Sequence, residues 1–399
     1  MFKIKNKFFK NSLPLLANYG VSLVGDTLYL FAINWFLVSQ TKTTSLLGEI
    51  NSISTLILLV SNIIVGPIVD SYNRKKLLIF SDLVSFLACL ICSLLFRDYV
   101  DDKFILIITS SILSISMAIN SPSAKAIVPY VVSKENIERF NSIQNTLSSV
   151  IKVSTPIIGS IILAINNNFN FFIFINSLSF LISAILISTV TYSEVKDNKL
   201  NARFHEQFFS GLKYVAKKTE ILGILIFISL LNFVMISYDL AIPYVINVLL
   251  KESDKLYSLV ISVEAIGGII GGLFLTYRSK KNSEDSFVQD ISYLSLALLL
   301  VGIFNNIYLI LLCSLINGFY LVQINAKVFT IIQKKTNQNY LGRVFALLFV
   351  FSSLFTPLSN FIFGKIIPIL QWHTFTLCSI SVFTTSYLIS KYFFGKVTS

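Results

Sequence analysis

Four ionisable residues lie inside long apolar stretches of the sequence, where a charge is costly to bury. They are Asp26, Lys152, Asp239 and Glu264. A charged side chain at the centre of a bilayer costs at least about 2.5 kcal/mol on insertion scales, so such residues often mark ion or substrate pathways. Carboxyl groups in these positions can take up and release protons. We therefore identify the four residues as candidates for coupling proton movement to substrate movement.

Polar residues accompany two of these charges at helical spacing. The residues that share a helix face with Asp26 are Asn18, Ser22 and Tyr29, and those that share one with Lys152 include Asn141 and Asn145. A polar stripe on an apolar helix faces a cavity or the protein interior rather than lipid. These five residues are therefore expected to line a cavity. The alternative is that Asp26 and Lys152 form a buried ion pair that only fixes the packing.

The other two acids have different surroundings. Asp239 lies near Asn232, a further candidate for the cavity wall, and near Pro243, which can break a helix and expose carbonyl groups to a cavity. A kinked helix with a capped acid near the outer surface would give the same pattern. Glu264 precedes two glycine pairs at helical spacing, which favours close packing of two helices over a binding loop.

The elements that must hold these residues are membrane-spanning helices. Hydrophobic residues make up 54% of the 399 residues, charged residues make up 13%, and the mean hydropathy is +0.75. About 20 apolar residues span the hydrocarbon core as a helix. The sequence therefore predicts an all-α integral membrane protein with twelve spans. These are 13–38, 45–69, 77–96, 104–124, 139–165, 169–190, 220–249, 256–277, 287–304, 307–330, 343–368 and 371–391.

A polar stretch divides the spans into two sets of six. We predict an N-terminal half over 1–190, a central loop over 191–219 and a C-terminal half over 220–399. Most of the 32 Lys and Arg residues fall in loops on the same side as the N-terminus, which places both termini in the cytoplasm. The net charge of +12 is spread over separate loops, so no nucleic-acid partner is indicated. The expected location is the cell membrane.

A short charged turn joins the second and third spans. Gly66, Asp70 and Arg74 follow one another at intervals of four residues, and Lys75 adds a second positive charge. On a continuing helix the three would share one face, where glycine permits close approach and Asp70 can accept from Arg74 or a helix N-terminus. We predict a cytoplasmic gate here. The alternative is a solvated turn whose charges only fix the topology.

These features together resemble the major facilitator superfamily, whose signature between helices two and three is glycine, three residues, aspartate and a basic cluster. Within that superfamily the chain is most similar to the branch of macrolide efflux proteins and the enterobactin exporter. The supporting stretches include Gly25-Asp26, Gly66 to Lys76, Ser81-Asp82 and Thr155 to Gly159. Pro156 and Gly159 resemble the element typical of antiporters in the superfamily. The resemblance implies two six-helix halves, a gate at Asp70, and a monomer that exports a small molecule.

Several other functions lack a sequence signal. The pair Cys89 and Cys92 lies in an apolar span, no phosphate-binding P-loop is present, and no metal-ligand or nucleophile cluster is found, so neither an enzyme nor a cofactor is expected. The favoured function is proton-driven export, and uptake or lipid flipping on the same fold is the alternative. Carboxyl groups in the cavity would suit a cationic drug such as a macrolide. Lys152 beside them would suit a siderophore or another metal chelator.

Overall fold

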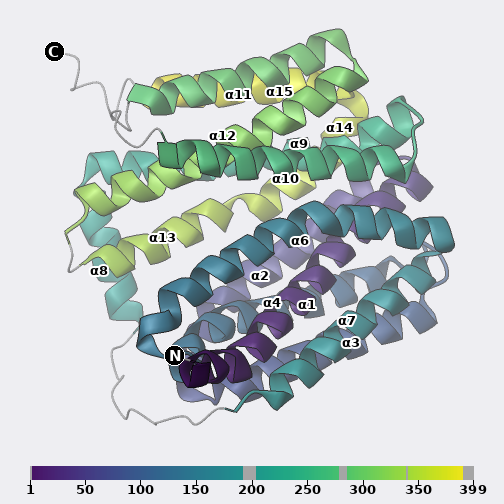
Figure 1. The fold of residues 1–399 in the computed structure, drawn as a ribbon. Coiled ribbons are helices and arrows are strands. Elements are labelled where there is room, and N and C mark those ends of the chain that lie inside the picture. The colour runs from purple at the N-terminus through teal and green to yellow at the C-terminus, as the bar shows by residue number, and fades with distance from the viewer. Residues whose placement is uncertain (1, 192–203, 278–284, 338–339, 390–399) are drawn as a thin grey trace. The chain divides into compact units, whose positions relative to one another are not determined.

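The structure is a computed structural model that describes residues 2–191, 204–277, 285–337 and 340–389. Helices dominate these ranges, and none of their residues forms a β-strand. Within the described ranges, ten helices are long and apolar enough to cross a membrane, and Gln289–Phe304 is a shorter apolar helix. The all-α membrane fold predicted from hydropathy is therefore confirmed (Figure 1).

Contacts divide the chain into two compact units, which are described separately. Unit 1 contains Met1–Thr41 and Ile53–Lys199, and unit 2 contains Lys42–Ser52 and Leu200–Ser399. The predicted division at 190 and 220 stays a prediction.

Unit 1 is a bundle of long helices. Its elements are α1 (Phe2–Thr41), most of α2 (Ser45–Ser71), α3 (Arg74–Leu95), α4 (Lys103–Ala126), α5 (Val128–Val131), η1 (Lys134–Asn136), α6 (Ile137–Ile165) and α7 (Phe169–Thr189). In this unit α1 packs against α6 and α7, and α3 packs against α4 and α7. The helix α7 therefore lies next to both α1 and α3.

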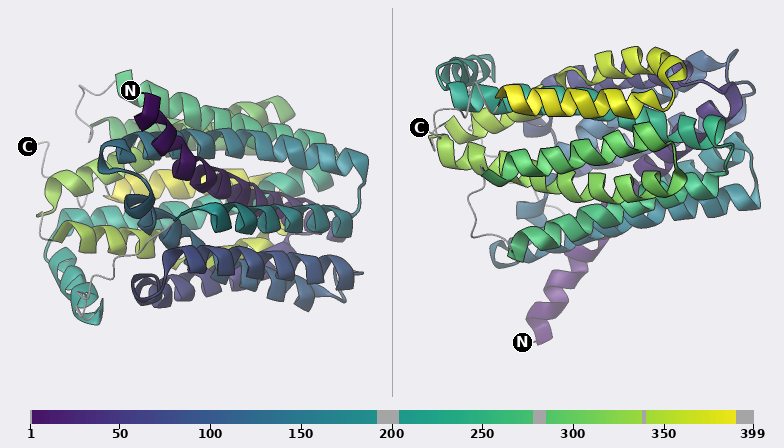
Figure 2. Two further views of the ribbon diagram at one scale, coloured as in Figure 1. Left: turned by 60° about the horizontal axis from the view of Figure 1, so that its bottom comes forward. Right: turned by 90° about the horizontal axis from the view of Figure 1, so that it is seen from above.

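Unit 2 repeats this pattern. Its elements are α8 (Phe204–Ala216), α9 (Thr219–Tyr244), the π-helical turn η2 (Val245–Leu249), α10 (Asp254–Tyr277), α11 (Asp285–Phe304), α12 (Ile307–Lys335), α13 (Leu341–Leu354), α14 (Thr356–Leu370) and α15 (His373–Ile389). Here α9 packs against α13, α14 and α15, and α11 packs against α12 and α15. Figure 1 shows α11 and α15 side by side, and Figure 2 shows the long helices of each unit running lengthwise along one another.

Local sequence explains several helix boundaries. Asn73 begins α3 as an N-cap, because its side chain accepts a hydrogen bond from the backbone N–H of Lys76 at 3.0 Å. Asn168 and Asn306 cap α7 and α12 in the same way. The predicted span 343–368 forms two helices that meet at Phe355, because Pro357 favours the first turn of a new helix.

Glycines bring α10 and α12 close together. A methyl group at Gly267 would overlap the backbone of Leu315, and one at Gly318 would overlap the carbonyl group of Glu264. The helices therefore approach with backbone against backbone, as small residues allow in membrane proteins. This packing agrees with the reading of these glycines as helix contacts, and it holds Glu264 close to α12.

Candidate functional site

Asp82 on α3 is the centre of the largest buried polar cluster described in unit 1. Its Oδ2 accepts hydrogen bonds from Asn18 Nδ2 at 3.0 Å and from Ser183 Oγ at 2.7 Å. Its Oδ1 accepts from Ser22 Oγ at 3.1 Å and from Asn120 Nδ2 at 3.0 Å. Only 1% of Asp82 is exposed. The carboxylate thus joins α1, α3, α4 and α7 through neutral donors on both of its oxygens.

Asn18 and Ser183 reinforce this cluster. Asn18 Nδ2 also donates to Ser183 Oγ at 2.7 Å and to the Ser183 carbonyl at 3.1 Å. Two residues predicted to line a cavity, Asn18 and Ser22, are therefore buried against Asp82. Tyr29, a third, is buried next to α4, where its hydroxyl lies 2.6 Å from Ser110 Oγ. Their transport role stays a prediction.

Asp26 lies one helical turn beyond Ser22 on the same face of α1 and is half-buried. Its carboxyl group is close enough to Asp82 and to Cys89, both on α3, for their charges to interact. Among the residues that the structure describes, Asp26 accepts no hydrogen bond and forms no ion pair. Unlike Asp82, it has no fixed donors that hold it as an anion.

The predicted stripe on α6 lies at the surface of unit 1. Lys152, Asn141 and Asn145 are exposed, and the described part of the chain contains no ion pair between Lys152 and Asp26. Pro156 is buried inside α6, and a methyl group at Gly159 would lie 2.6 Å from Phe31 Cδ1. The Pro156 to Gly159 segment therefore packs directly on α1, the helix that carries Asp26.

In unit 2, Asp239 is exposed although its neighbours Tyr238 and Leu240 are buried. Glu264 accepts a hydrogen bond from Asn317 Nδ2 at 3.0 Å, and its charge interacts with that of Asp239. No cation pairs with either acid within the described ranges.

The predicted cavity residue Asn232 donates to the Ser352 carbonyl on α13 at 2.9 Å. Pro243 lies inside α9, and the π-helical turn η2 follows it directly.

Sequence reasoning missed a buried ion pair between Asp290 on α11 and Lys327 on α12. Asp290 is 2% exposed and Lys327 is 7% exposed. The two residues are 37 positions apart, and Asp82 and Asn120 are 38 positions apart on the corresponding helices of unit 1. An acid followed by a polar residue at this separation was the available sequence signal.

The predicted gate is described in part. Gly66 and Asp70 lie on α2, but their side chains are outside the described residues. The Arg74 guanidinium lies 4.9 Å from the centre of the Tyr130 ring. Lys75 Nζ donates to the carbonyls of Ser188 at 2.7 Å and Val190 at 2.8 Å. Lys75 thus binds the C-terminal end of α7, where a positive charge is favourable.

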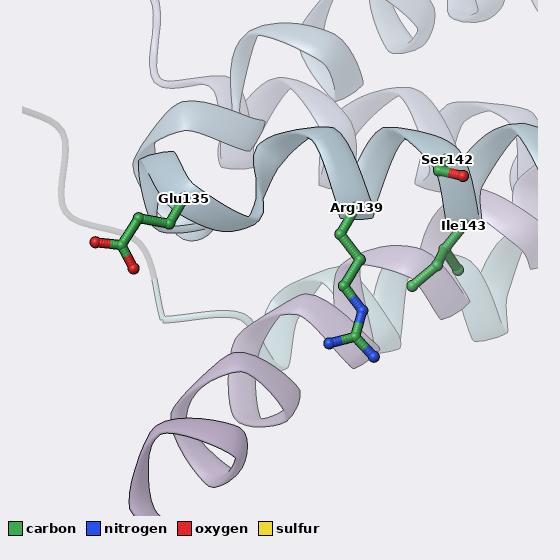
Figure 3. Close-up of a pocket in the computed structure, with 4 residues that line it drawn as sticks. All are labelled: Glu135, Arg139, Ser142 and Ile143. Atoms are coloured by element: carbon green, nitrogen blue, oxygen red, sulfur yellow. The ribbon is translucent and has the colours of Figure 1, made fainter. Parts of the chain in front are cut away.

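One open pocket lies near the N-terminal end of α6. Its volume is about 380 Å³, and Glu135, Arg139, Ser142 and Ile143 line it (Figure 3). Arg139 extends from α6 into this space. Lys152 is 13 residues further along the helix, which corresponds to about 20 Å, so it does not belong to this pocket.

No group of three or more His, Cys, Asp or Glu residues that could hold a metal ion occurs in the described ranges. In the spans described, Asp82 accepts four hydrogen bonds from neutral donors and Asp290 pairs with Lys327. Glu264 accepts one hydrogen bond from Asn317, and no cation pairs with Asp26, Asp239 or Glu264 among the described residues. Carboxyl groups inside membrane spans can exchange protons or bind a cationic ligand.

Comparison with known proteins gives a consistent result. The model of the family described as "Major Facilitator Superfamily" matches residues 15–360. The chain is 22% identical over 359 residues to "Macrolide efflux protein A" of Streptococcus pyogenes, which covers 89% of this chain and 87% of the relative. It is 23% identical over 318 residues to the "Staphyloferrin A transporter" of Staphylococcus aureus, which covers 78% of this chain and 77% of that protein.

Solved structures show the same fold at lower identity. A mutant of the nucleoside transporter NupG superposes with a TM-score of 0.80 at 11% identity, covering 95% of this chain and 98% of that chain. A bacterial homologue of the iron transporter ferroportin, in its inward-facing state, gives a TM-score of 0.72 at 15% identity and covers 95% and 98%.

Proposed function

The chain belongs to the major facilitator superfamily, and from this premise we propose that it exports a small molecule across the cell membrane in exchange for protons. Family membership makes it a multi-pass membrane transporter and not an enzyme. The direction of transport, the coupling ion and the substrate are the parts that we propose.

The observation that carries this proposal is the set of carboxyl groups in the spans without a cationic partner. Asp26, Asp239 and Glu264 are each unpaired with a cation in the described structure. A negative charge inside a membrane span is costly when no cation compensates it, so each site favours uptake of a proton or of a positively charged ligand. Competition between the two at one site would couple inward proton flow to outward substrate flow.

Alternating access supplies the movement. In this proposal, each unit moves largely as a rigid body around a substrate site near the middle of the membrane. The turn with Gly66, Asp70, Arg74 and Lys75 serves as the cytoplasmic gate, and Pro156 and Gly159 give α6 the flexible, closely packed segment that an antiporter needs. Both termini lie in the cytoplasm, and one chain is the working unit.

A cationic amphiphile is the first candidate substrate. The carboxyl groups of Asp26, Asp239 and Glu264 have no cationic partner among the described residues, and the relative named for macrolide efflux covers most of the chain. A siderophore is the second candidate, because Lys152 is exposed on α6 and a relative of similar identity is named for staphyloferrin A. Positive charge at Lys152 would attract the carboxylates of such a chelator.

Accumulation in cells tests the proposal. Radiolabelled macrolides and radiolabelled iron-free siderophores are supplied to cells with and without the gene, before and after an uncoupler collapses the proton gradient. We expect deletion to trap one compound inside the cell and the uncoupler to have the same effect. Lower internal levels after deletion would indicate an importer, and insensitivity to the uncoupler would rule out proton coupling.

A further inference from the structure

We propose that Asp82 is a positioning residue, which holds a fixed negative charge beside Asp26 and thereby sets the pH range in which Asp26 exchanges a proton. This inference rests on the proposed function, in which Asp26 is a coupling residue. It adds Asp82 on α3, which does not itself exchange the proton. Asp82 stays charged, whereas Asp26 takes up and releases the proton.

Hydrogen bonding distinguishes the two acids. Asp82 accepts two hydrogen bonds on each oxygen, and the donors are the side chains of Asn18, Ser22, Asn120 and Ser183. The amide N–H groups of Asn18 and Asn120 can only donate, one to each oxygen, and all four donors are used together only when Asp82 is charged, so the cluster favours the charged form. Asp26 has no such donors in the described structure. When the two acids share one proton, Asp26 is therefore the one that binds it.

The helix register brings the two acids together. Ser22 on α1 donates a hydrogen bond to Asp82 on α3. Asp26 lies one turn further along the same face of α1, within range of the charges of Asp82 and Cys89 on α3. Helix neighbours one turn apart are about 6 Å from each other.

Few other charges face Asp26. On α3 the groups that interact with it are Asp82 and Cys89, and on its own helix Tyr29 lies about one turn away. The helix α6 carries Lys152, whose side chain is exposed and forms no ion pair with Asp26. The helix α7 contains no titratable residue. Asp82 is therefore the main fixed charge that acts on Asp26.

Unit 2 provides a natural comparison. The acid of α11, Asp290, occupies the place of Asp82, and Lys327 on α12 occupies the place of Asn120. The positive charge of Lys327 cancels that of Asp290. In unit 1 the partner is a neutral amide, so the negative charge of Asp82 remains and acts on its surroundings. Unit 1 has the neutral Asn120 where unit 2 has Lys327. The negative charge of the buried acid is therefore left uncompensated by this partner in unit 1 only.

Infrared titration of the purified full-length protein tests this without a substrate. The band of the protonated Asp26 carboxyl is identified by its loss in Asp26→Asn, and its midpoint pH is then measured in other variants. Asp82→Asn removes the charge, and Asn120→Lys keeps Asp82 but adds a cation that copies Lys327. We expect both variants to move the Asp26 midpoint to lower pH by about one unit or more. The double variant Asp290→Asn, Lys327→Gln is the control and should leave it unchanged.

Each outcome separates this inference from the proposed function. An unchanged midpoint in Asp82→Asn and Asn120→Lys would overturn it, as would an Asp26 band that does not titrate in the wild type. If the Asp82→Asn variant does not fold, the Asp26 midpoint in the Asn120→Lys variant decides the question. A shifted midpoint in a protein whose transport ignores the proton gradient would support the inference while refuting proton-driven export. Proton-coupled transport with an unshifted Asp26 midpoint would support the proposed function and refute the inference.

Discussion

Asn120 on α4 donates a hydrogen bond of 3.0 Å from Nδ2 to Oδ1 of Asp82 on α3. The bond connects two helices that are adjacent in sequence, and the same carboxylate also binds α1 and α7. A single buried acid therefore holds together four helices of unit 1. The stability of unit 1 is therefore expected to depend on these hydrogen bonds.

Removing a donor from this cluster should destabilise the protein. Asn18→Ala deletes the amide that bonds both Asp82 and Ser183 and leaves a buried carboxylate oxygen short of a donor. The expected loss is about 1–3 kcal/mol of unfolding free energy. Thermal unfolding in detergent measures it. Asn62→Ala, at an exposed position of α2, is the control and should leave the midpoint unchanged.

The Asp290–Lys327 pair should be far more sensitive to loss of one partner than to loss of both. Lys327→Met removes the cation that pairs with the buried Asp290, which costs about 3–5 kcal/mol. Asp290→Asn combined with Lys327→Gln removes both charges and should recover most of this stability. Equal melting midpoints for the single and double variants would show that the pair is not coupled.

Part of the fold follows directly from hydropathy. The apolar runs predicted helices at membrane length, because every backbone group must be bonded inside a bilayer. The break between α13 and α14 was missed because composition is uniform across Phe355, although Pro357 gave a local signal. A window of hydropathy averages over such a break.

The site was harder to predict because its contacts are remote in sequence. Asp26 was found as an isolated charge, whereas Asp82 was read only as a flank of the Gly66 to Lys76 motif. The partners of Asp82 come from residues up to 101 positions away. The same applies to Lys327, which resembles the cations that mark the cytoplasmic side but is buried against Asp290. Residue type and spacing along one helix do not reveal a bond to another helix.

The predicted gate gives a kinetic test. Asp70→Asn should reduce the turnover rate by about tenfold, which corresponds to about 1.4 kcal/mol, while substrate affinity changes little. The physical reason is that a gate stabilises one conformation rather than the substrate. Tyr72→Phe, at an exposed position on the same turn, serves as the control. Parallel loss of affinity and turnover in Asp70→Asn would argue for a binding or folding role instead.

The turn between α3 and α4 should show a pH-dependent contribution to stability. The pKa of Asp98 is lowered from its ordinary value of 3.8, because its carboxylate accepts hydrogen bonds from the backbone N–H groups of Asp101 and Val100. A lowered folded-state pKa means that this stability is present above the unfolded value and is lost as the pH falls through the folded value.

Asp98→Ala should therefore melt at a lower temperature than the wild type above about pH 5, and the difference should shrink below about pH 4. Asp101→Ala keeps the backbone donor and provides the control. A difference between wild type and Asp98→Ala that stays constant down to about pH 3 would contradict the assignment.

Proton movement by the purified transporter, reconstituted in vesicles with a trapped pH-sensitive dye, tests proton-driven export most directly. A labelled compound that cells trap after deletion of the gene is added on one side, with no initial pH gradient. We predict that its flux drives protons in the opposite direction and that Asp26→Asn abolishes this proton flux. Substrate flux without proton flux in the wild type, or unchanged proton flux in Asp26→Asn, would contradict the account.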